Sequence, residues 1–287
     1  MGRRARQGHG QAVRPRAPRP EPAGRRRGRS RRVHRRADRP LPRLARPLTH
    51  LSRRAVVPPG ENRPVNDPRS APLRARVTGP VAAVLLVLAA ALLALAATGV
   101  LQTADTATAV GLAADRVPGV TVVALIVTEI GNTVGSTAVG LVGGAVLALR
   151  GRAAAGLCLA ATPPVASVVF TVLKQLIDRP RPPAELQVTF IANESLPSGH
   201  ATMVAAAWTA LVLALWPVLR SRGRTLLTAF AVLWAGAVGF SRLYLGVHWL
   251  SDVLAGWTLG AALAFTGVTV LSLVLARRTR RPDTAAA

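Results

Sequence analysis

Long apolar stretches separated by short polar ones fill the chain from about residue 80 onward. The clearest, residues 80–101, contains no charged side chain. A helix that crosses a hydrocarbon core about 30 Å thick needs roughly 20 apolar residues, whereas the strands of a membrane barrel are shorter and alternate apolar with polar positions. The pattern therefore predicts six membrane-spanning helices, over residues 80–101, 133–149, 153–177, 200–219, 225–245 and 250–276. The second has an alternative start in the apolar stretch from Val120 to Glu129.

These spans predict an all-α fold, a six-helix integral membrane bundle that occupies residues 78–276. Alanine and glycine are frequent in the spans, and small residues allow helices to approach closely in lipid. The same small-residue faces suit contacts within one chain or between chains, so the sequence does not specify an oligomeric state. The single cysteine, Cys158, lies in an apolar stretch, and we interpret it as a small packing residue that cannot form an intrachain disulfide.

Charged residues in the short loops predict the orientation of the bundle, because arginine and lysine concentrate on the cytoplasmic side of a membrane. The loops after the second and fourth spans and the segment after the sixth carry such residues. They are Arg150, Arg152, Arg220, Arg222, Arg224, Arg277, Arg278, Arg280 and Arg281. We therefore expect a multi-pass protein of the cell membrane with both termini in the cytoplasm and residues 277–287 as a short cytoplasmic tail. Residues 178–199 and the turn before His248 would then lie on the extracytoplasmic side.

The first 77 residues differ in composition from the rest of the chain. The formal net charge is +25 although half of all residues are hydrophobic, and 23 of the 37 basic residues lie in residues 1–77. This Arg/Pro-rich segment has too few large apolar residues to offset the entropy of ordering its backbone, so we expect a disordered cytoplasmic tail. Beside a membrane, its arginines would contact anionic lipid headgroups rather than nucleic acid. An alternative is that translation starts near Val77 and that the tail is not made.

Three polar clusters lie at span ends on the predicted extracytoplasmic face. Charged side chains there are costly unless they are paired, solvated or used, which makes each a candidate functional group. The clusters are Lys174 with Arg181-Pro182; Pro197-Ser198-Gly199-His200; and Ser241-Arg242 with His248 and Asp252. Ser198 and Gly199 stand at the start of the fourth span, so we expect them to offer free backbone N–H groups to an anion. His248 and Asp252 are four residues apart, hence on one helix face and within hydrogen-bonding reach.

The clusters combine cations, backbone amides, two imidazoles and a carboxylate, which are the groups that phosphoryl transfer uses. If Asp252 binds one imidazole nitrogen of His248, it raises the nucleophilicity of the other. His200 would act as the acid for the leaving oxygen. The cations that would neutralise the phosphoryl oxygens are Lys174, Arg181 and Arg242.

The three clusters resemble the signature of the type-2 phosphatidic acid phosphatase superfamily, in its membrane lipid phosphatase branch. That signature is Lys, six residues, Arg-Pro; then Pro-Ser-Gly-His; then Ser-Arg, five residues, His, three residues, Asp. All three blocks match in order and without a departure, and the resemblance covers about residues 78–276. It implies a six-helix membrane fold, a phosphohistidine intermediate on His248, His200 as the proton donor, and neither a metal nor another cofactor.

Other interpretations of the same residues are weaker. A zinc site built from His200, His248 and Asp252 has suitable ligand types, but the surrounding cations would repel a divalent ion. Vanadate-dependent haloperoxidases share the signature but resemble soluble proteins. We interpret Arg179 as an interfacial neighbour of the first cluster rather than part of it. The aromatic residues beside the third cluster, Tyr244 and Trp249, fit the enrichment of aromatic side chains at membrane interfaces.

The predicted function is therefore removal of phosphate from a lipid phosphate or diphosphate at the extracytoplasmic face. The candidate substrates are phosphatidic acid, phosphatidylglycerol phosphate, and isoprenyl diphosphates such as the undecaprenyl carrier; headgroup selectivity would depend on residues 183–196. Two alternatives stay open: a lipid phosphotransferase with the same intermediate, and a non-catalytic membrane protein that binds or moves a phospholipid. The expected partners are the bilayer and its lipid phosphate.

Overall fold

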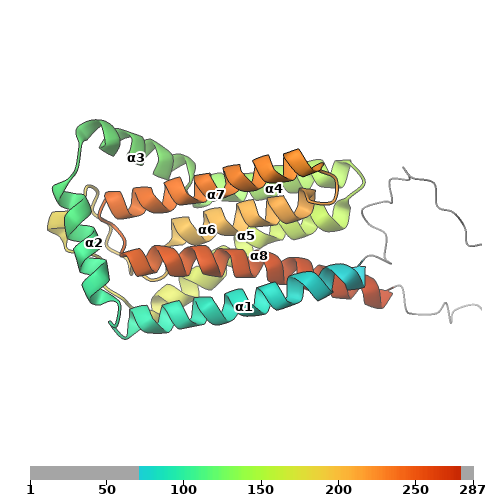
Figure 1. Ribbon diagram of the computed structural model, residues 1–287, viewed down its shortest axis with the longest axis horizontal. Coiled ribbons are helices and arrows are strands. Elements are labelled where there is room, and N and C mark those ends of the chain that lie inside the picture. Colours follow the sequence, from blue (N-terminus) through green and yellow to red (C-terminus); the bar gives the residue numbers. More distant parts are fainter. Residues whose placement is uncertain (1–70, 279–287) are drawn as a thin grey trace, which may run out of the picture. The chain divides into compact units, whose positions relative to one another are not determined.

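The computed structural model describes residues 71–278, which form eight α-helices and one 3-10 turn (Figure 1). The helices are α1 (Ala71–Ala97), α2 (Gln102–Ala114), α3 (Pro118–Ile130), α4 (Thr133–Leu149), α5 (Ala153–Ile177), α6 (Gly199–Leu215), α7 (Ser221–Tyr244) and α8 (Leu250–Arg278), and the 3-10 turn η2 covers Ala184–Leu186. No β-strand occurs in this part of the chain, so the predicted all-α class is confirmed. Most of the predicted basic tail and the last part of the predicted C-terminal tail lie outside the described residues.

The eight helices exceed the six predicted because the region between the first two predicted spans is itself helical. It forms α2 and α3, each of 13 residues. A helix of that length is about 20 Å long, shorter than the hydrocarbon core of a bilayer. Pro118 stands at the first position of α3, and the side chain of Asn132 caps α4 by accepting a hydrogen bond of 2.9 Å from the Gly135 amide. The sequence therefore contains local start signals for α3 and α4.

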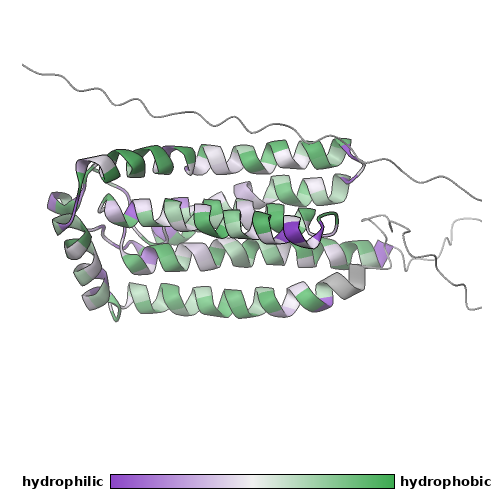
Figure 2. Cartoon of the chain, turned by 45° about the horizontal axis from the view of Figure 1, so that its top comes forward, coloured by the Kyte–Doolittle hydropathy of each residue, from purple (hydrophilic) through white to green (hydrophobic). Residues whose placement is uncertain are grey.

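Four helices are long and apolar enough to cross a membrane: Ala75–Ala97, Ala153–Ile177, Ser221–Tyr244 and Leu250–Arg278. The α3–α4 pair reaches that length only jointly, with a bend of 45° at its break, and α6 is a shorter apolar helix of 17 residues. Figure 2 shows hydrophobic residues along most of these helices and hydrophilic ones mainly toward their ends. Each predicted span thus has a helix near its bounds, whereas six complete crossings stay a prediction.

Along α1, small residues face the interior and large aliphatic side chains face outward. On α1, which packs along α8 (Figure 1), Val84 and Val87 are 68% and 71% exposed, whereas Ala89 and Ala96 are 2% and 1% exposed. This distribution suits a bilayer, where lipid chains solvate the aliphatic residues and close helix contact provides the packing energy.

Glycine sets the separation between α6 and α8. A Cβ added at Gly260 would lie 2.2 Å from the Thr202 carbonyl oxygen, and one added at Gly256 would lie 2.8 Å from the Ser198 carbonyl oxygen. No side chain fits at such distances, so the two backbones touch. This contact brings the first turn of α6 beside the first turn of α8.

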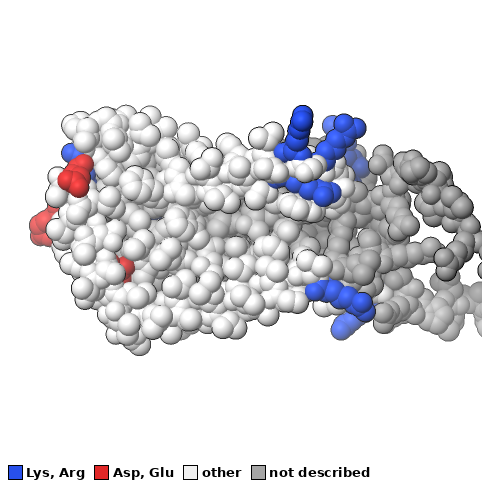
Figure 3. All heavy atoms as spheres, viewed as in Figure 1, with Lys and Arg blue, Asp and Glu red and all other residues white. Residues whose placement is uncertain are grey.

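The ends of α5 and α7 and the starts of α6 and α8 meet at one end of the helices, and α2 lies across that end (Figure 1). The α4–α5 and α6–α7 connections and the last turn of α8 lie at the other end. Figure 3 shows most visible Lys and Arg side chains at that second end and the Asp and Glu side chains at the first. The three motifs of the sequence therefore lie together, away from the arginine-rich connections.

Candidate active site

His248 lies in the turn between α7 and α8 and is 3% exposed. Its Nδ1 is 3.3 Å from Oδ2 of Asp252, which also accepts a 2.9 Å hydrogen bond from the Trp249 amide. Its Nε2 is 3.1 Å from a guanidinium nitrogen of Arg181. Because a guanidinium can only donate, Nε2 is the ring nitrogen with the lone pair, and Nδ1 carries the proton toward Asp252.

The surroundings of His248 keep its imidazole neutral. Burial lowers the pKa of His248 well below its usual value, and the nearby cations Arg181, Arg242 and Lys174 lower it further. Neutral imidazole with an unprotonated Nε2 is the form that attacks phosphorus. The predicted His248–Asp252 pair is therefore present, in the tautomer that a nucleophile needs.

The cations of the first motif are held by the segment before α6. Lys174 donates to the carbonyl of Glu194, and Arg181 donates at 2.6 Å both to the carbonyl and to the side-chain oxygen of Asn193. Burial lowers the pKa of Arg181 to about 10, although Asp252 and Glu194 oppose the shift, so Arg181 keeps its charge at neutral pH. Residues 183–196, predicted to affect headgroup selectivity, thus touch two of the predicted phosphate-binding side chains.

Arg242, in the last turn of α7, is 4% exposed and donates a hydrogen bond of 2.6 Å to the hydroxyl of Thr128 in α3. Its Nε is one of the buried side-chain atoms that have no hydrogen-bond partner among the described residues, and Ser198 Oγ is another. A buried polar atom without a partner is costly, so both atoms are suited to contact a bound oxyanion.

The second motif differs in one respect from the prediction. The amide of Ser198 is not free, because it donates a hydrogen bond of 3.1 Å to the backbone carbonyl of Asp252. The prediction of two free amides is therefore wrong for Ser198, and the close approach of α6 to α8 explains why. Gly199 is the first residue of α6, where a Cβ would lie 3.0 Å from the Phe170 ring. His200 follows in the first helical turn, half-buried and hydrogen-bonded to the backbone of Thr128.

Three residues at this end escaped the sequence interpretation. Arg179, taken as an interfacial side chain, is only 6% exposed and forms an ion pair of 2.7 Å with Asp252. Asp105 of α2, which lies between the first two predicted spans, is 1% exposed and pairs with Arg179 at 2.8 Å. Thr128 contacts both Arg242 and His200. The local sequence indicates a role for Asp105 only by placing a carboxylate in the apolar region 101–114. It does not indicate which residue pairs with that carboxylate.

Tyr244 and Trp249 are buried rather than spread along a membrane interface. The Tyr244 hydroxyl accepts from the Val117 amide at 2.7 Å and donates to the Val117 carbonyl at 3.1 Å. The Trp249 indole donates to the Pro180 carbonyl at 2.9 Å. Both aromatic residues therefore hold neighbouring backbone segments around the site.

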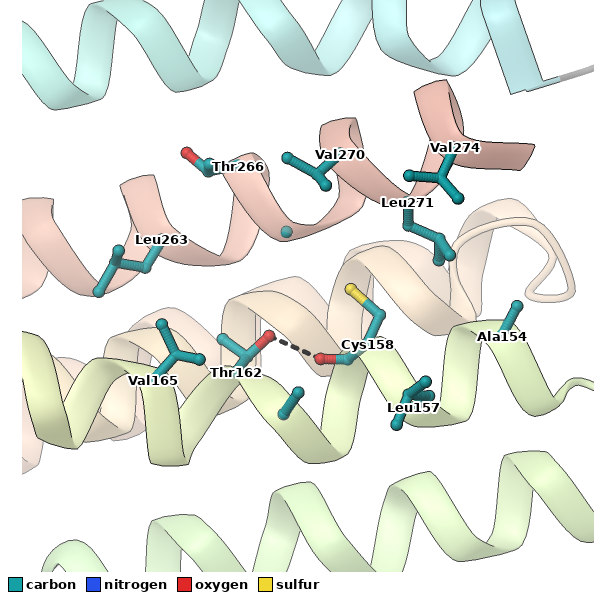
Figure 4. Close-up of a pocket in the computed structure, with 12 residues that line it drawn as sticks. Ala154, Leu157, Cys158, Thr162, Val165, Leu263, Thr266, Val270, Leu271 and Val274 are labelled. Carbon is teal, nitrogen blue, oxygen red and sulfur yellow. Dashed lines mark hydrogen bonds between the residues drawn. The ribbon is translucent and has the colours of Figure 1, made fainter. Parts of the chain in front are cut away.

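A separate apolar cavity of about 390 Å³ lies between α5 and α8 (Figure 4). It is lined by residues such as Leu157, Cys158, Leu263 and Val270, and none of the motif residues reaches it. The Cys158 carbonyl accepts the Thr162 hydroxyl within α5 at 2.7 Å. The cavity contains no charged group and is distinct from the candidate active site.

Comparisons with known proteins agree with this geometry. The PAP2 superfamily matches residues 153–279. An undecaprenyl-diphosphatase from Sulfolobus acidocaldarius is 31% identical over 117 residues, which are 38% of this chain and 51% of that protein. Phosphatidylglycerophosphatase B from Escherichia coli is 44% identical over 70 residues, 24% of this chain and 26% of that protein. The enzyme of the same name from Bacillus subtilis is 37% identical over 97 residues, 33% of this chain and 47% of that protein. The match thus spans about half or less of each of these relatives.

A solved structure shares the fold more widely. It is the crystal structure of the transmembrane PAP2-type phosphatidylglycerolphosphate phosphatase from Bacillus subtilis, which aligns with a TM-score of 0.59 and 28% identity over 65% of this chain and 93% of that one. With the apolar helices described above, this similarity identifies a multi-pass membrane protein. Residues 153–279, which hold all three motifs, belong to the PAP2 superfamily.

Proposed function

We propose that this protein is a membrane phosphatase that removes phosphate from a lipid phosphate or diphosphate through a phosphohistidine intermediate on His248. The observation that carries this proposal is the orientation of His248, with Nδ1 on Asp252 and Nε2 beside Arg181. An imidazole held in this way presents its nucleophilic nitrogen to the place where cations would hold a phosphoryl group.

In the first step Nε2 of His248 attacks phosphorus, so that an N–P bond forms and the bond from phosphorus to the lipid oxygen breaks. His200 gives a proton to that oxygen, and the lipid leaves as an alcohol or as a monophosphate. In the second step water attacks the phosphohistidine and gives a proton to His200. The N–P bond breaks, inorganic phosphate leaves, and both histidines regain their first states.

Lys174, Arg181 and Arg242 would neutralise the phosphoryl oxygens in both steps. Ser198 Oγ and the N-terminal end of α6 at Gly199 would add hydrogen bonds. These groups supply the positive charge that a divalent ion supplies in other phosphatases, and they disfavour such an ion by repulsion. The proposed reaction therefore requires no metal.

Two observations support a lipid substrate. The site stands at the ends of helices whose outer surfaces are apolar, so a substrate anchored in the bilayer can bring its headgroup there by lateral diffusion. The relatives act, by their names, on undecaprenyl diphosphate and on phosphatidylglycerol phosphate. Both substrates share a phosphate on a lipid anchor, and that class is the one we propose here. By the positive-inside rule the arginine-rich end would face the cytoplasm, and the site would then lie on the extracytoplasmic side.

Phosphate release tests the proposal. The full chain, purified in detergent with EDTA present, is given phosphatidic acid, phosphatidylglycerol phosphate and undecaprenyl diphosphate in turn. Release from at least one of them that disappears in His248→Ala supports the mechanism, and ³²P-labelled substrate should leave a labelled, acid-labile protein in a quenched reaction. Cys158→Ala, at the distant cavity, serves as the control and should keep wild-type release.

The alternatives predict other results. A phosphotransferase would transfer label to an alcohol acceptor faster than to water. A binding or transport protein would retain lipid without releasing phosphate, and His248→Ala would not change its binding. Normal turnover by folded His248→Ala would exclude the proposed nucleophile.

A further inference from the structure

Arg179 joins two buried carboxylates from opposite ends of the described sequence. One guanidinium nitrogen donates to Oδ1 of Asp252 at 2.7 Å and to the Ser251 hydroxyl at 2.8 Å. The other donates to Oδ2 of Asp105 at 2.8 Å and to the Gln102 side chain at 3.2 Å. Arg179, Asp105 and Asp252 are 6%, 1% and 0% exposed. We call this arrangement the Arg179 bridge.

Asp105 also holds the start of α8. Its Oδ1 accepts the Ser251 amide at 2.8 Å, and its Oδ2 accepts the Ser251 hydroxyl at 2.5 Å. Ser251 is the second residue of α8, where backbone amides have no partner within the helix. The carboxylate of Asp105 thus caps α8, the helix that carries Asp252. Asp105 itself lies in α2, outside the region that matches the PAP2 superfamily.

The two oxygens of Asp252 have separate tasks. Oδ2 faces Nδ1 of His248 and the Trp249 amide, whereas Oδ1 is bound by Arg179. Rotation of the carboxylate could not improve the contacts of Oδ2 with His248 and Trp249 without weakening the contact of Oδ1 with Arg179. Arg179 therefore fixes the plane in which Asp252 meets the imidazole.

The charges of the bridge also bear on His248. One guanidinium shared by two carboxylates leaves a net charge of about one negative unit beside the imidazole. Without Asp105, the charge of Arg179 would be balanced by Asp252 alone. The negative charge of Asp252 would then stabilise a proton on His248 less. Without Arg179, two buried carboxylates would face each other, and one would take up a proton.

We propose that Arg179 and Asp105 are positioning residues that keep Asp252 ionised and oriented toward His248. The proposal rests on the phosphatase function proposed above and adds to it the residues that position Asp252. α2 is then part of the catalytic apparatus, although it carries no motif and touches no phosphate-binding side chain in the contacts described above. The bridge contacts Asp252 and Ser251 but none of the proposed phosphate-binding side chains, so we expect it to change turnover and not substrate binding.

The charged and titratable groups around the His248–Asp252 pair determine how the pH dependence of kcat/KM changes when the bridge is altered. They are Lys174 of α5, Arg179 and Arg181 of the following segment, Asp105 of α2, His200 of α6 and Arg242 of α7. Three of these, Lys174, Arg181 and Arg242, are cations outside the bridge that stay in place when it is altered. Arg179→Met and Asp105→Asn therefore each remove one charge from an otherwise constant field. The pair titrates as a unit, and the acid limb of kcat/KM reports its apparent pKa.

The test compares the pH profile of kcat/KM for the full-length wild type and its variants in detergent. Arg179→Met should lower kcat about 10- to 100-fold with KM within about threefold, by analogy with other groups that orient a catalytic ligand. Its acid limb should move to higher pH. Asp105→Asn, which keeps an acceptor for the Ser251 amide, should lower kcat less and move the limb to lower pH. Arg179→Lys should restore the wild-type limb without full turnover, because it returns the charge but not the paired hydrogen bonds to Asp105 and Asp252.

Arg116→Met is the matched control, since Arg116 is a partly buried arginine at the same end whose hydrogen bonds go to the carbonyls of Tyr244 and Leu186. It should lower the melting temperature and leave the acid limb in place. An unmoved limb in folded Arg179→Met, or a raised KM with unchanged kcat, would overturn the proposal. An inactive wild type would overturn the proposed phosphatase function instead, so the two failures are distinguishable.

Discussion

The Thr128 hydroxyl accepts a hydrogen bond of 2.6 Å from Arg242, which ties the end of α3 to the end of α7. Thr128 lies two residues before the end of α3, just ahead of the break to α4, and it is 3% exposed. The bent α3–α4 pair therefore holds a cation that we propose binds phosphate, as well as contributing to the apolar helical bundle.

Thr128→Val keeps the shape of the side chain and removes the acceptor. Arg242 would then lose its described partner, and we expect kcat/KM to fall about tenfold, the effect of losing one hydrogen bond to a charged group. Phosphate release at limiting substrate measures this. Thr121→Val on the same helix is the control, since the Thr121 hydroxyl bonds only to the Val117 carbonyl within α3. Equal activity in the two variants would show that Thr128 does not position Arg242.

His200→Ala should affect substrates according to their leaving groups. A lipid alcohol leaves poorly and needs a proton, so release should fall about 10²- to 10⁴-fold. A soluble aryl phosphate with an acidic phenol needs little assistance and should lose far less. Rates for a series of phosphate esters, plotted against the pKa of the leaving alcohol, give the comparison. An equal loss along the whole series would assign His200 a binding role.

Stability should fall in acid because His248 is buried in its neutral form. The pKa of His248 is lowered in the folded protein, whereas in the unfolded chain it is about 6.5. Below pH 6.5 the unfolded chain gains a proton that the folded protein does not bind, so the stabilisation present above that pH is lost as the pH falls, by at most about 1.4 kcal/mol per pH unit. Thermal unfolding between pH 7.5 and 5 should show a smaller slope in His248→Gln. Identical slopes would contradict the assigned burial.

Gly246→Ala should be far more damaging than Gly151→Ala. Both glycines have positive φ, +71° and +73°, so each substitution adds backbone strain of about 1–3 kcal/mol. A Cβ at Gly246 would also lie 1.9 Å from the Leu186 carbonyl oxygen, while one at Gly151 meets no atom within 4 Å. The displaced turn carries His248, so Gly246→Ala should lose phosphate release as well as thermal stability. Similar melting temperatures and activities in the two variants would rule out the close contact as the cause.

The local patterns of the sequence predicted much of the site. Apolar runs of membrane length predicted the positions of the long helices, because a bilayer requires that length whatever the neighbouring helices are. The spacing of His248 and Asp252 predicted their contact, but not on one helix face, because His248 lies in the turn before α8. The prolines after Asp178 cannot continue α5, so Lys174 lies in the last turn of that helix and Arg181 in the loop that follows it.

Only the tertiary structure decided which distant groups meet. Asp105 and Arg179 are 74 positions apart, and their pairing depends on α2 lying across the start of α8. The amide of Ser198 is occupied because α6 and α8 touch at glycines, a contact that the motif around Ser198 does not encode. Local periodicity fixes neighbours within one helix, whereas contacts between helices arise from the packing of the whole bundle. The sequence therefore determined the chemical groups of this site, and the fold determined how they are held.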